Sequence, residues 1–399
     1  MAAVDDLISE HLPLATDLRR RLHQIPELGY EEFKTAAAIR ADLDRLNVGY
    51  IAGVETAPTA TVATIGDTSK PCIALRADID ALPITEATGL PYASTHPGRM
   101  HACGHDGHSA NLVGTAAVLK SLADRAQLGC CVKLIWQPAE EGGGGAQRLV
   151  EAGVLDGRLG PRVTAIFGLH GWPGLKVGTV ASKAGALLAA TDTWQATFVG
   201  KGCHAAFPHM GTDPIVTAAE AVTNLQQFVS REVNPVEPAV VTVGRIAGGT
   251  ASNVIPDSVE IEGTARTLTP TLRKHIRQSI ERRCRGLAAA GCCELKFEWW
   301  DGYPPTVNDP AMTDYLARVA KATLGPDRFY LAPFPSMGGE DFAYYLEQVP
   351  GCFFLVGVEP QGAEGYPPLH SDRYNFTDAA LGVGMRMFVE LARNWGDNG

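Results

Sequence analysis

Apolar positions along the chain follow two different periods, and these predict where helices and strands lie. An apolar stripe at helical spacing runs over residues 5–49, with an interruption near residues 26–29 where Pro and Gly occur close together. Residues 56–66 and 72–79 are predicted as strands, and the second is too apolar to have a solvated face. Helices are then predicted over 108–126 and 144–154, with buried strands over 130–138 and 163–171. Such alternation is typical of a mostly parallel α/β sheet.

The pattern changes from about residue 183 onward. Strands are predicted over 191–201, 239–249, 258–268 and 293–302, and long helices over 213–233 and 269–291. That order is β-α-β-β-α-β, which is a complete split-βαβ sandwich. Helix–strand alternation returns after residue 310. We therefore expect an α/β domain from residues 1–182 and 299–399, with a mixed, mostly parallel sheet flanked by helices. Residues 183–298 are expected to form a smaller, inserted α+β domain.

Composition narrows the class of protein. The 399 residues include 34 Lys and Arg against 44 Asp and Glu, a net charge of −10, which argues against nucleic acid or an anionic membrane as partner. No apolar run approaches the roughly 20 residues that span a bilayer. The first residues lack the positive and apolar regions of a signal peptide, so a cytoplasmic location is expected. Nine irregularly spaced cysteines are expected to be mostly reduced and buried.

The densest chemical cluster lies within residues 100–108. It contains His101, Cys103, His105, Asp106 and His108, all of which are plausible ligands for a divalent metal ion. If the segment is extended, positions 103 and 105 point to the same side and can reach one ion together. Capping and core histidines with an inert cysteine are the alternative, but the density of donors favours metal.

Two acidic pairs follow predicted buried strands. Asp78 and Asp80 stand where open α/β sheets place their sites, and they would either ligate metal, orient a ligating imidazole or belong to a solvated turn. Glu140 and Glu141 would point in opposite directions on an extended chain. One carboxylate would then bind metal while the other accepted a proton from a metal-bound water, although acidic pairs are also common on surfaces.

Single histidines complete the set of donors. His170 and His370 end apolar runs in the same predicted domain, and with Cys103, His105 and one Glu they supply five ligands, enough for two ions. In the inserted domain, Gly-flanked His204 lies next to Cys203. No orienting third group is evident for a Cys–His nucleophile there.

These motifs together resemble the M20 metallopeptidase family, in its aminoacylase-like branch of amidohydrolases. The segments LRRRLHQIPELGYEE, ALRADIDALPI, MHACGHDGHSA, QPAEEGGGGA, GLHGWP, GKGCHAAFPH, SNVIPD, GTART, SMGGEDFAYY and LHSD occur in the family's order over nearly the whole chain. Where the wider family commonly has glycine before the lid histidine, this chain has Cys203, whose thiol would narrow the pocket or make it sensitive to oxidation.

The resemblance implies that residues 1–182 and 299–399 form the metal-binding catalytic domain and that residues 183–298 form a lid and dimerisation domain. It also implies a role for each matching residue. Two divalent ions would be ligated by Cys103, His105, Glu141, His170 and His370, with Glu140 as general base and Asp80 orienting a metal-site residue. His204 would reach across a dimer interface to polarise the scissile carbonyl in the partner subunit. The substrate would contact Asn253, Arg266, Gly338 and Gly339, with Arg266 a candidate for the carboxylate.

The expected function is a dinuclear metal-dependent amidohydrolase that cleaves N-acyl amino acids by attack of a metal-bound water. Zinc, manganese, cobalt and nickel all suit such donors. A homodimer or homotetramer through the lid is expected. A metallo-dipeptidase or carboxypeptidase with the same chemistry is the alternative. A regulatory protein with a structural metal site, or an enzyme with a Cys103 nucleophile, fits the residues less well.

Overall fold

The computed structural model describes residues 2–395, and its internal contacts divide the chain into two compact units. The larger unit comprises Met1–Leu187, Val307–Phe334 and Asp341–Gly399, and the inserted unit comprises Leu188–Thr306 and Pro335–Glu340. The domain boundaries at residues 183 and 298 and the function of the inserted part stay predictions.

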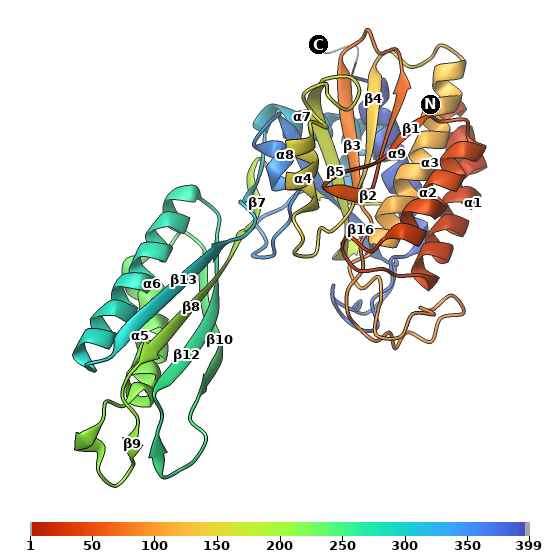
Figure 1. Ribbon diagram of the computed structural model, residues 1–399. Coiled ribbons are helices and arrows are strands. Elements are labelled where there is room, and N and C mark those ends of the chain that lie inside the picture. The colour runs from red at the N-terminus through yellow and green to blue at the C-terminus, as the bar shows by residue number, and fades with distance from the viewer. Residues whose placement is uncertain (1, 396–399) are drawn as a thin grey trace. The chain divides into compact units, whose positions relative to one another are not determined.

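The larger unit is built on an eight-stranded sheet in the order β1-β2-β4-β3-β5-β16-β6-β15 (Figure 1). The strands are β1 (Tyr50–Val54), β2 (Ala57–Gly66), β3 (Cys72–Asp78), β4 (Cys131–Gln137), β5 (Val163–Lys176), β6 (Val180–Ser182), β15 (Phe329–Leu331) and β16 (Gly351–Glu359). The central strands β4, β3, β5 and β16 are parallel to one another. At one edge, β2 is antiparallel to β4, and β1 is antiparallel to β2. The predicted mixed, mostly parallel sheet is confirmed.

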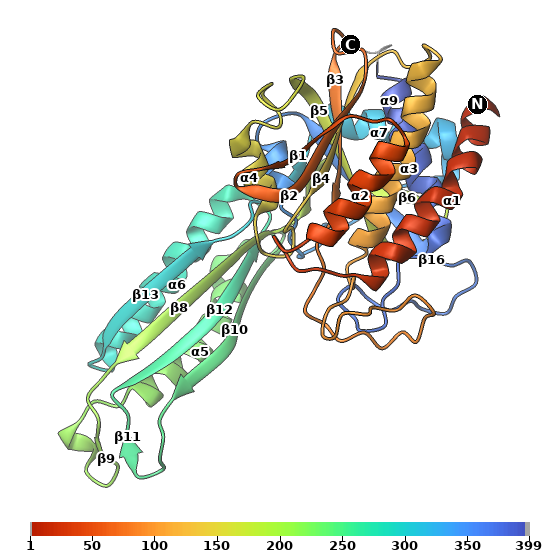
Figure 2. The same ribbon diagram turned by 45° about the vertical axis from the view of Figure 1, so that its right-hand side comes forward.

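Helices flank this sheet, and one of them is almost completely enclosed. Helices α1 (Ala2–Gln24), α2 (Phe33–Arg45), α3 (His105–Asp124), α7 (Pro310–Leu324) and α9 (Leu381–Arg393) contribute to one hydrophobic core with the strands (Figure 2). Short helices α4 (Gly145–Ala152) and α8 (Ala343–Leu346) pack against each other. Every residue of α3 from 105 to 119 is buried, so its polar side chains must find partners inside the protein.

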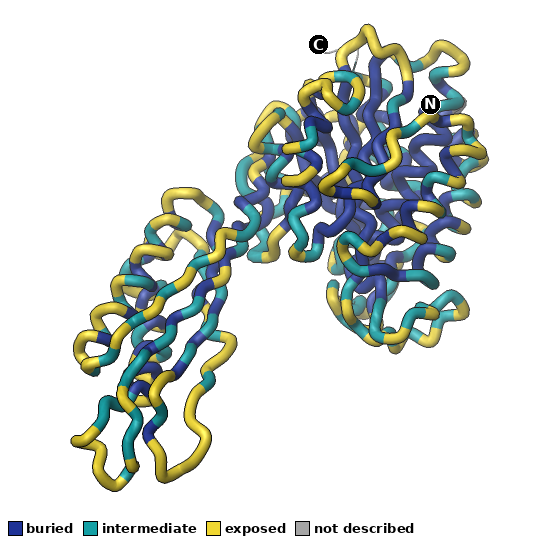
Figure 3. The backbone as a smooth tube through the Cα atoms, in the orientation of Figure 1, coloured by how far each residue is buried: buried dark blue, intermediate teal, exposed yellow. Residues whose placement is uncertain are grey.

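The inserted unit is the predicted sandwich of one sheet and two helices. Its antiparallel sheet has the order β10-β12-β8-β13, and α5 and α6 share one apolar core with it. The elements are β8 (Ala190–Val199), α5 (Pro214–Glu232), β10 (Ala239–Gly248), β12 (Ser258–Thr267), α6 (Pro270–Ala290) and β13 (Glu294–Asp301). Buried and partly exposed positions alternate along β8 and β12, as a one-sided sheet requires (Figure 3).

Local sequence explains where the long helices begin. Asp213, Thr269 and Asp309 each accept a hydrogen bond from a first-turn backbone N–H of α5, α6 and α7, and each is followed by a proline. A capping oxygen and a proline with its φ already fixed both favour helix initiation at that point.

The sequence pattern did not predict the shortest elements, which include β1, β6, β15 and α8. It also did not predict β7 (Gly185–Leu188), which pairs with β14 (Thr306–Asn308), or β9 (Cys203–His204), which pairs with β11 (Val254–Ile255). The 3₁₀ turns are η1 (Pro208–Met210), η2 (Pro326–Arg328) and η3 (Asp378–Ala380). Elements of two to five residues are too short to establish a period. Within residues 2–395, no helix has the length and apolar character needed to cross a membrane.

Candidate metal centre

The predicted acidic residues lie at the carboxyl ends of two adjacent parallel strands. Asp78 is the last residue of β3 and pairs in register with Gln137 at the end of β4. Asp80 follows the first strand end, and Glu140 and Glu141 follow the second. Because parallel strands present their carboxyl ends at one edge, the two acidic segments share the location where open α/β sheets bind ligands.

Cys103 and His105 come together through a tight turn. Gly104 between them has a φ of +92°, in the left-handed region that favours glycine, and α3 begins directly at His105. A Cβ at position 104 would lie 3.0 Å from the hydroxyl of Tyr374, so a larger residue would also require that side chain to move. The predicted extended segment is wrong, but the turn brings both donors to the same group.

The two single histidines reach this group from distant parts of the chain. His170 lies inside β5 rather than at a strand end, and its Nε2 is 3.3 Å from Cys103 Sγ. His370 lies in a loop with a φ of +64°, and its backbone N–H donates to Ala102 O at 2.9 Å. Its Nε2 is 3.3 Å from Glu141 Oε1, and its side chain is 53% exposed.

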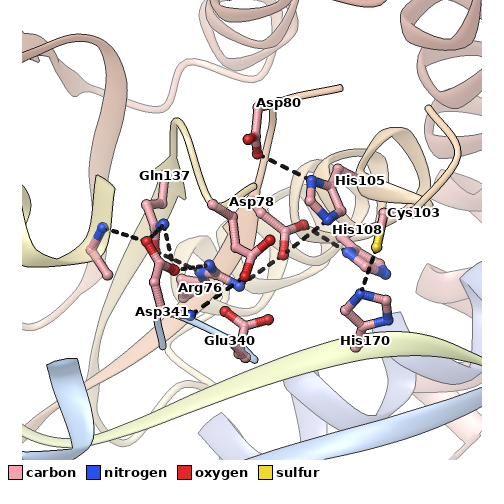
Figure 4. A network of polar contacts seen from close by, with 12 residues as sticks. Arg76, Asp78, Asp80, Cys103, His105, His108, Gln137, His170, Glu340 and Asp341 are labelled. Carbon is pink, nitrogen blue, oxygen red and sulfur yellow. Dashed lines mark hydrogen bonds and ion pairs between the residues drawn. The ribbon is translucent and has the colours of Figure 1, made fainter. Parts of the chain in front are cut away.

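All five predicted ligands and Glu140 lie in overlapping groups whose donor atoms are within 4.8 Å of one another. The groups are Cys103 with His105 and His170, Cys103 with Glu141 and His370, and His105 with Glu140 and Glu141. Shared members make these groups one continuous set of donors, part of which is drawn in Figure 4.

Glu140 and Glu141 do not point apart as the extended-chain argument predicts. Both bring an oxygen within 4.8 Å of a nitrogen of the same imidazole, that of His105. The backbone is not extended here, because Ala139 has a φ of +53° and Gly142 a φ of +101°. A non-glycine residue in the left-handed region is strained, and such strain occurs often at functional sites.

Asp80 connects two of the predicted ligands. Its Oδ1 lies 3.1 Å from His105 Nδ1, and its Oδ2 accepts the backbone N–H of Glu141 at 2.9 Å. A proton on His105 Nδ1, directed at Asp80, leaves the Nε2 lone pair available for a metal ion.

A competing group contains Asp78, His105 and His108, but two of its members are already engaged. Asp78 accepts from His108 Nδ1 at 2.7 Å and from Arg76 Nη1 at 2.8 Å. His108 Nε2 accepts the backbone N–H of Gly171 at 2.8 Å, so both of its ring nitrogens are used. The group with Cys103 and His170 is therefore the better candidate.

The remaining members of the 100–108 cluster do not join the donor set. Asp106 Oδ2 lies 2.7 Å from His23 Nδ1 and 3.0 Å from Arg19 Nε, in a buried ion-paired cluster of its own. His101 is buried, and neither ring nitrogen hydrogen-bonds to another described residue.

The charges around the donors favour a cation. Burial lowers the pKa of His105, but the carboxylates of Asp78, Asp80 and Glu141 outweigh it and raise the value to about 10. Burial raises the pKa of the Cys103 thiol well above its ordinary value, and neighbouring carboxylates raise it further. The carboxylates thus favour a positive charge among the donors. A bound metal ion would supply this charge, and without one it is carried by protonated His105.

The donor set fits divalent metal better than it fits a Cys–His nucleophile. His105 Nε2 is buried and makes no hydrogen bond within residues 2–395, as expected of a ligand atom. Glu141 Oε1 is also buried, and it lies 3.3 Å from Nε2 of His370, another predicted ligand. Burial, with His108 nearby, lowers the pKa of His170 well below its ordinary value. His170 is therefore a poor acceptor for the proton of Cys103, so the pair is not an activated nucleophile.

In the inserted unit, His204 and Asn253 line one surface pocket. The pocket has a volume of about 670 Å³, and Cys203 also lines it. His204 pairs with Val254 through β9 and β11, and its Nδ1 accepts the backbone N–H of Ala206 at 3.1 Å. In this tautomer the proton is on Nε2, so that nitrogen is a hydrogen-bond donor.

Arg266 and the two predicted glycines lie at the other end of the inserted sheet. Arg266 is half-buried on β12, and its register partner on β8 is Thr191. Gly338 O accepts the backbone N–H of Ala189 at 2.8 Å, and a Cβ on Gly339 would lie 2.2 Å from the methyl group of Thr191. Only glycine allows this close approach.

Several polar residues that support the site were not singled out from the sequence. Asp341 donates its backbone N–H to Glu140 Oε1 at 3.4 Å, and Glu32 Oε1 accepts the backbone N–H of Ala139 at 2.9 Å. The signal that could have found Asp341 is its acidic neighbour Glu340, since the pair directly follows two glycines. Glu32 lies more than 100 residues from its partner, and no local pattern indicates that contact.

Replacing Glu32 by Gln is expected to change how stability depends on pH. Glu32 is fully buried, and burial raises its pKa to about 7, with Asp80 adding to the shift against a hydrogen bond from Thr59. A raised pKa stabilises the fold fully below about 4.5 and loses this contribution as pH rises through about 7. Relative to Glu32→Gln, the wild type should thus lose on the order of 3 kcal/mol of unfolding free energy between pH 4.5 and 8.

Urea unfolding of both proteins across this pH range measures the difference. The Gln carbonyl can still accept the Ala139 N–H, whereas Glu32→Ala removes this acceptor and should lower the free energy of unfolding more than Glu32→Gln does. An equal pH dependence in wild type and Glu32→Gln would show that Glu32 does not titrate in this window.

Comparison with known proteins defines the class and then the family. The chain is 46% identical over 348 residues to N-acetyl-L-cysteine deacetylase of Bacillus subtilis, covering 86% of this chain and 80% of the relative. It is 39% identical to IAA-amino acid hydrolase ILR1-like 4 of Arabidopsis thaliana, covering 95% and 84%. This chain is therefore a hydrolase.

The model of peptidase family M20/M25/M40 matches residues 74–394, and the chain belongs to that family. A solved structure, the Bacillus subtilis YXEP protein, is a dinuclear metal binding peptidase from the M20 family. It is 37% identical, with a TM-score of 0.84 over 98% of this chain and 100% of that one. The resemblance inferred from the motifs is confirmed, and so is the fold class.

Proposed function

We propose that the chain is a dinuclear metal-dependent amidohydrolase that hydrolyses N-acyl amino acids to a carboxylic acid and a free amino acid. The observation that carries the proposal is the continuous donor set around Cys103, His105 and Glu141, with Glu140 beside it. Relatives that deacetylate N-acetyl-L-cysteine and N-acetyldiaminopimelate, or hydrolyse IAA-amino acids, support this substrate class.

Cys103, His105, Glu141, His170 and His370 would hold two ions of zinc, manganese, cobalt or nickel. Bound divalent ions lower the pKa of water and polarise a carbonyl oxygen. The shared donors support two neighbouring positions, because Cys103 belongs both to a group with two imidazoles and to a group with Glu141 and His370.

Glu140 is the group that would move the proton. It is buried, lies next to His105, and receives the backbone N–H of Asp341 at Oε1. Its carboxylate takes a proton from the attacking water, whose oxygen forms the new bond to the acyl carbon. As the C–N bond breaks, Glu140 delivers this proton to the leaving amine.

The distance between groups in the inserted unit supports a site shared by two subunits. Arg266 would bind the substrate carboxylate near Gly338 and Gly339, at the end of the sheet where β8 begins. His204 and Asn253 lie beyond the other end of β8, whose ten residues span about 30 Å. An N-acyl amino acid is on the order of 10 Å long, so it cannot contact both groups of one chain. We infer that His204 serves the partner subunit of a homodimer, alone or within a homotetramer, in the cytoplasm.

Metal analysis followed by a substrate screen tests the proposed function. The purified protein should contain about two divalent ions per chain, and a chelator should abolish hydrolysis, which added metal restores. N-acetyl and longer N-acyl amino acids should be cleaved faster than dipeptides. Preference for dipeptides would assign the same chemistry to a peptidase, and activity that survives complete chelation would exclude the metal mechanism.

A further inference from the structure

Arg76 occupies a central position beneath the metal centre, although it is not one of the proposed ligands. It lies on β3 with a fully buried side chain. Nη1 donates to Asp78 Oδ2 at 2.8 Å, Nη2 donates to Asp341 Oδ1 at 2.9 Å, and Nε donates to Gln137 Oε1 at 2.8 Å. One guanidinium therefore joins the ends of β3 and β4 to the segment at residue 341 (Figure 4).

The first set of contacts leads from Arg76 to the predicted ligand His170. Asp78 accepts from His108 Nδ1 at 2.7 Å, and His108 Nε2 accepts the N–H of Gly171 at 2.8 Å. The carbonyl of Gly171 in turn accepts from His170 Nδ1 at 2.8 Å. Asp78 and His108 thus hold Gly171 through its N–H, and the carbonyl of the same residue orients the imidazole of His170, whose Nε2 is left facing Cys103.

The second set leads from Arg76 to the predicted base Glu140. The carboxylate of Asp341 accepts from Arg76, from Gln137 Nε2 at 2.8 and 2.9 Å, and from the backbone N–H of Ala146 at 2.9 Å. Gln137 and Ala146 flank the loop that carries Glu140. The backbone N–H of Asp341 donates to Glu140 itself. The side chain of Asp341 therefore holds both ends of the loop, and its backbone N–H holds the carboxylate of Glu140.

Resting on the proposed function, we propose that Arg76 is a positioning residue. Through the two sets of contacts, it holds the side chains of His170 and Glu140 in place at the metal centre. Three N–H directions of a planar fork meet three separate acceptors, and this arrangement is specific to arginine. Lysine has the same charge but a single compact ammonium, so it can neutralise the buried carboxylates without fixing all three acceptors.

Arg76→Lys should therefore weaken both metal binding, through His170, and catalysis, through Glu140, while the protein remains folded. We expect kcat on an N-acyl amino acid to fall about 10- to 100-fold, with KM within about three-fold, because the substrate contacts are elsewhere. The dissociation constant for Zn²⁺, measured against a chromogenic chelator, should rise about 10- to 100-fold. Arg283→Lys is the matched control, since Arg283 makes a comparable fork to Asn224 and Glu232 in the inserted unit.

Two further variants test the contacts to His170 and to Glu140 one at a time. They also test the proposal if Arg76→Lys does not fold. His108→Asn keeps a donor for Asp78 but loses the contact to Gly171, so Zn²⁺ affinity should fall, and excess Zn²⁺ should restore most of the lost rate. Asp341→Asn should lower kcat with Zn²⁺ affinity unchanged within about three-fold, and excess Zn²⁺ should not restore it.

Wild-type protein measured alongside distinguishes the two possible failures. A wild type that binds no Zn²⁺ and cleaves no N-acyl amino acid would remove the proposed function, and this inference with it. A functional wild type would contradict the inference alone if Arg76→Lys kept its kcat and Zn²⁺ affinity or lost only stability. Identical defects in His108→Asn and Asp341→Asn would also contradict it.

Discussion

Glu140→Gln is expected to lower kcat by about a hundred- to ten-thousand-fold while the protein keeps its full metal content. The amide has nearly the shape of the carboxylate but cannot accept a proton from water at neutral pH, and general base catalysis contributes about 10²- to 10⁴-fold. Glu140 is not among the five proposed ligands, so the ions should stay bound. Steady-state kinetics and elemental analysis of the same preparation measure both quantities.

Glu151→Gln is the matched control for this variant. Glu151 is exposed on α4 and accepts a hydrogen bond from Gln147, so its neutralisation should leave kcat and metal content unchanged. Near-normal activity of Glu140→Gln would show that another group acts as the base. Loss of metal together with activity would instead make Glu140 a ligand.

Two inactive chains should form one active dimer when Glu140→Gln is combined with His204→Ala. In the mixed dimer, one site has both an intact Glu140 and a His204 from the other chain, so about half of the wild-type activity per dimer should return. Co-expression with two different tags isolates the mixed dimer from the two inactive parents. The expectation follows from the position of His204, at the opposite end of the inserted sheet from Arg266.

The control pairs Glu140→Gln with a chain that carries both substitutions, because neither site of that dimer has a base. His275→Ala, on an exposed part of α6, tests whether loss of any histidine in the inserted unit reduces the rate. A Glu140→Gln/His204→Ala mixed dimer as inactive as its parents would place His204 and Glu140 of the same chain at one site.

Much of the candidate site could be predicted from the sequence, because its donors lie where local patterns are strong. Cys103 and His105 stand in a dense cluster, and Glu140 and Glu141 follow a buried strand that ends at a sheet edge. The architecture follows from the two apolar periods. It also follows from the N-termini of α5, α6 and α7, where a capping residue is followed by proline.

The details that depend on backbone turns or distant contacts could not be predicted. The orientation of the acidic pair depends on a left-handed Ala139, which an extended-chain argument cannot foresee. Arg76 and Asp341 are separated by 265 positions and pair only because the sheet brings them together. Short strands such as β9, which carries His204, offer too few residues for any period.

The order of strands in the large sheet also has a consequence for how the chain folds. β16 lies between β5 and β6, parallel to the first and antiparallel to the second. During synthesis, β5 therefore keeps an open edge while the whole inserted unit is made, until residues 351–359 arrive. An unpaired edge of this kind invites association with other chains. Early folding of the inserted unit, which has its own core, would bring the segments before and after it together and shorten the time this edge stays open.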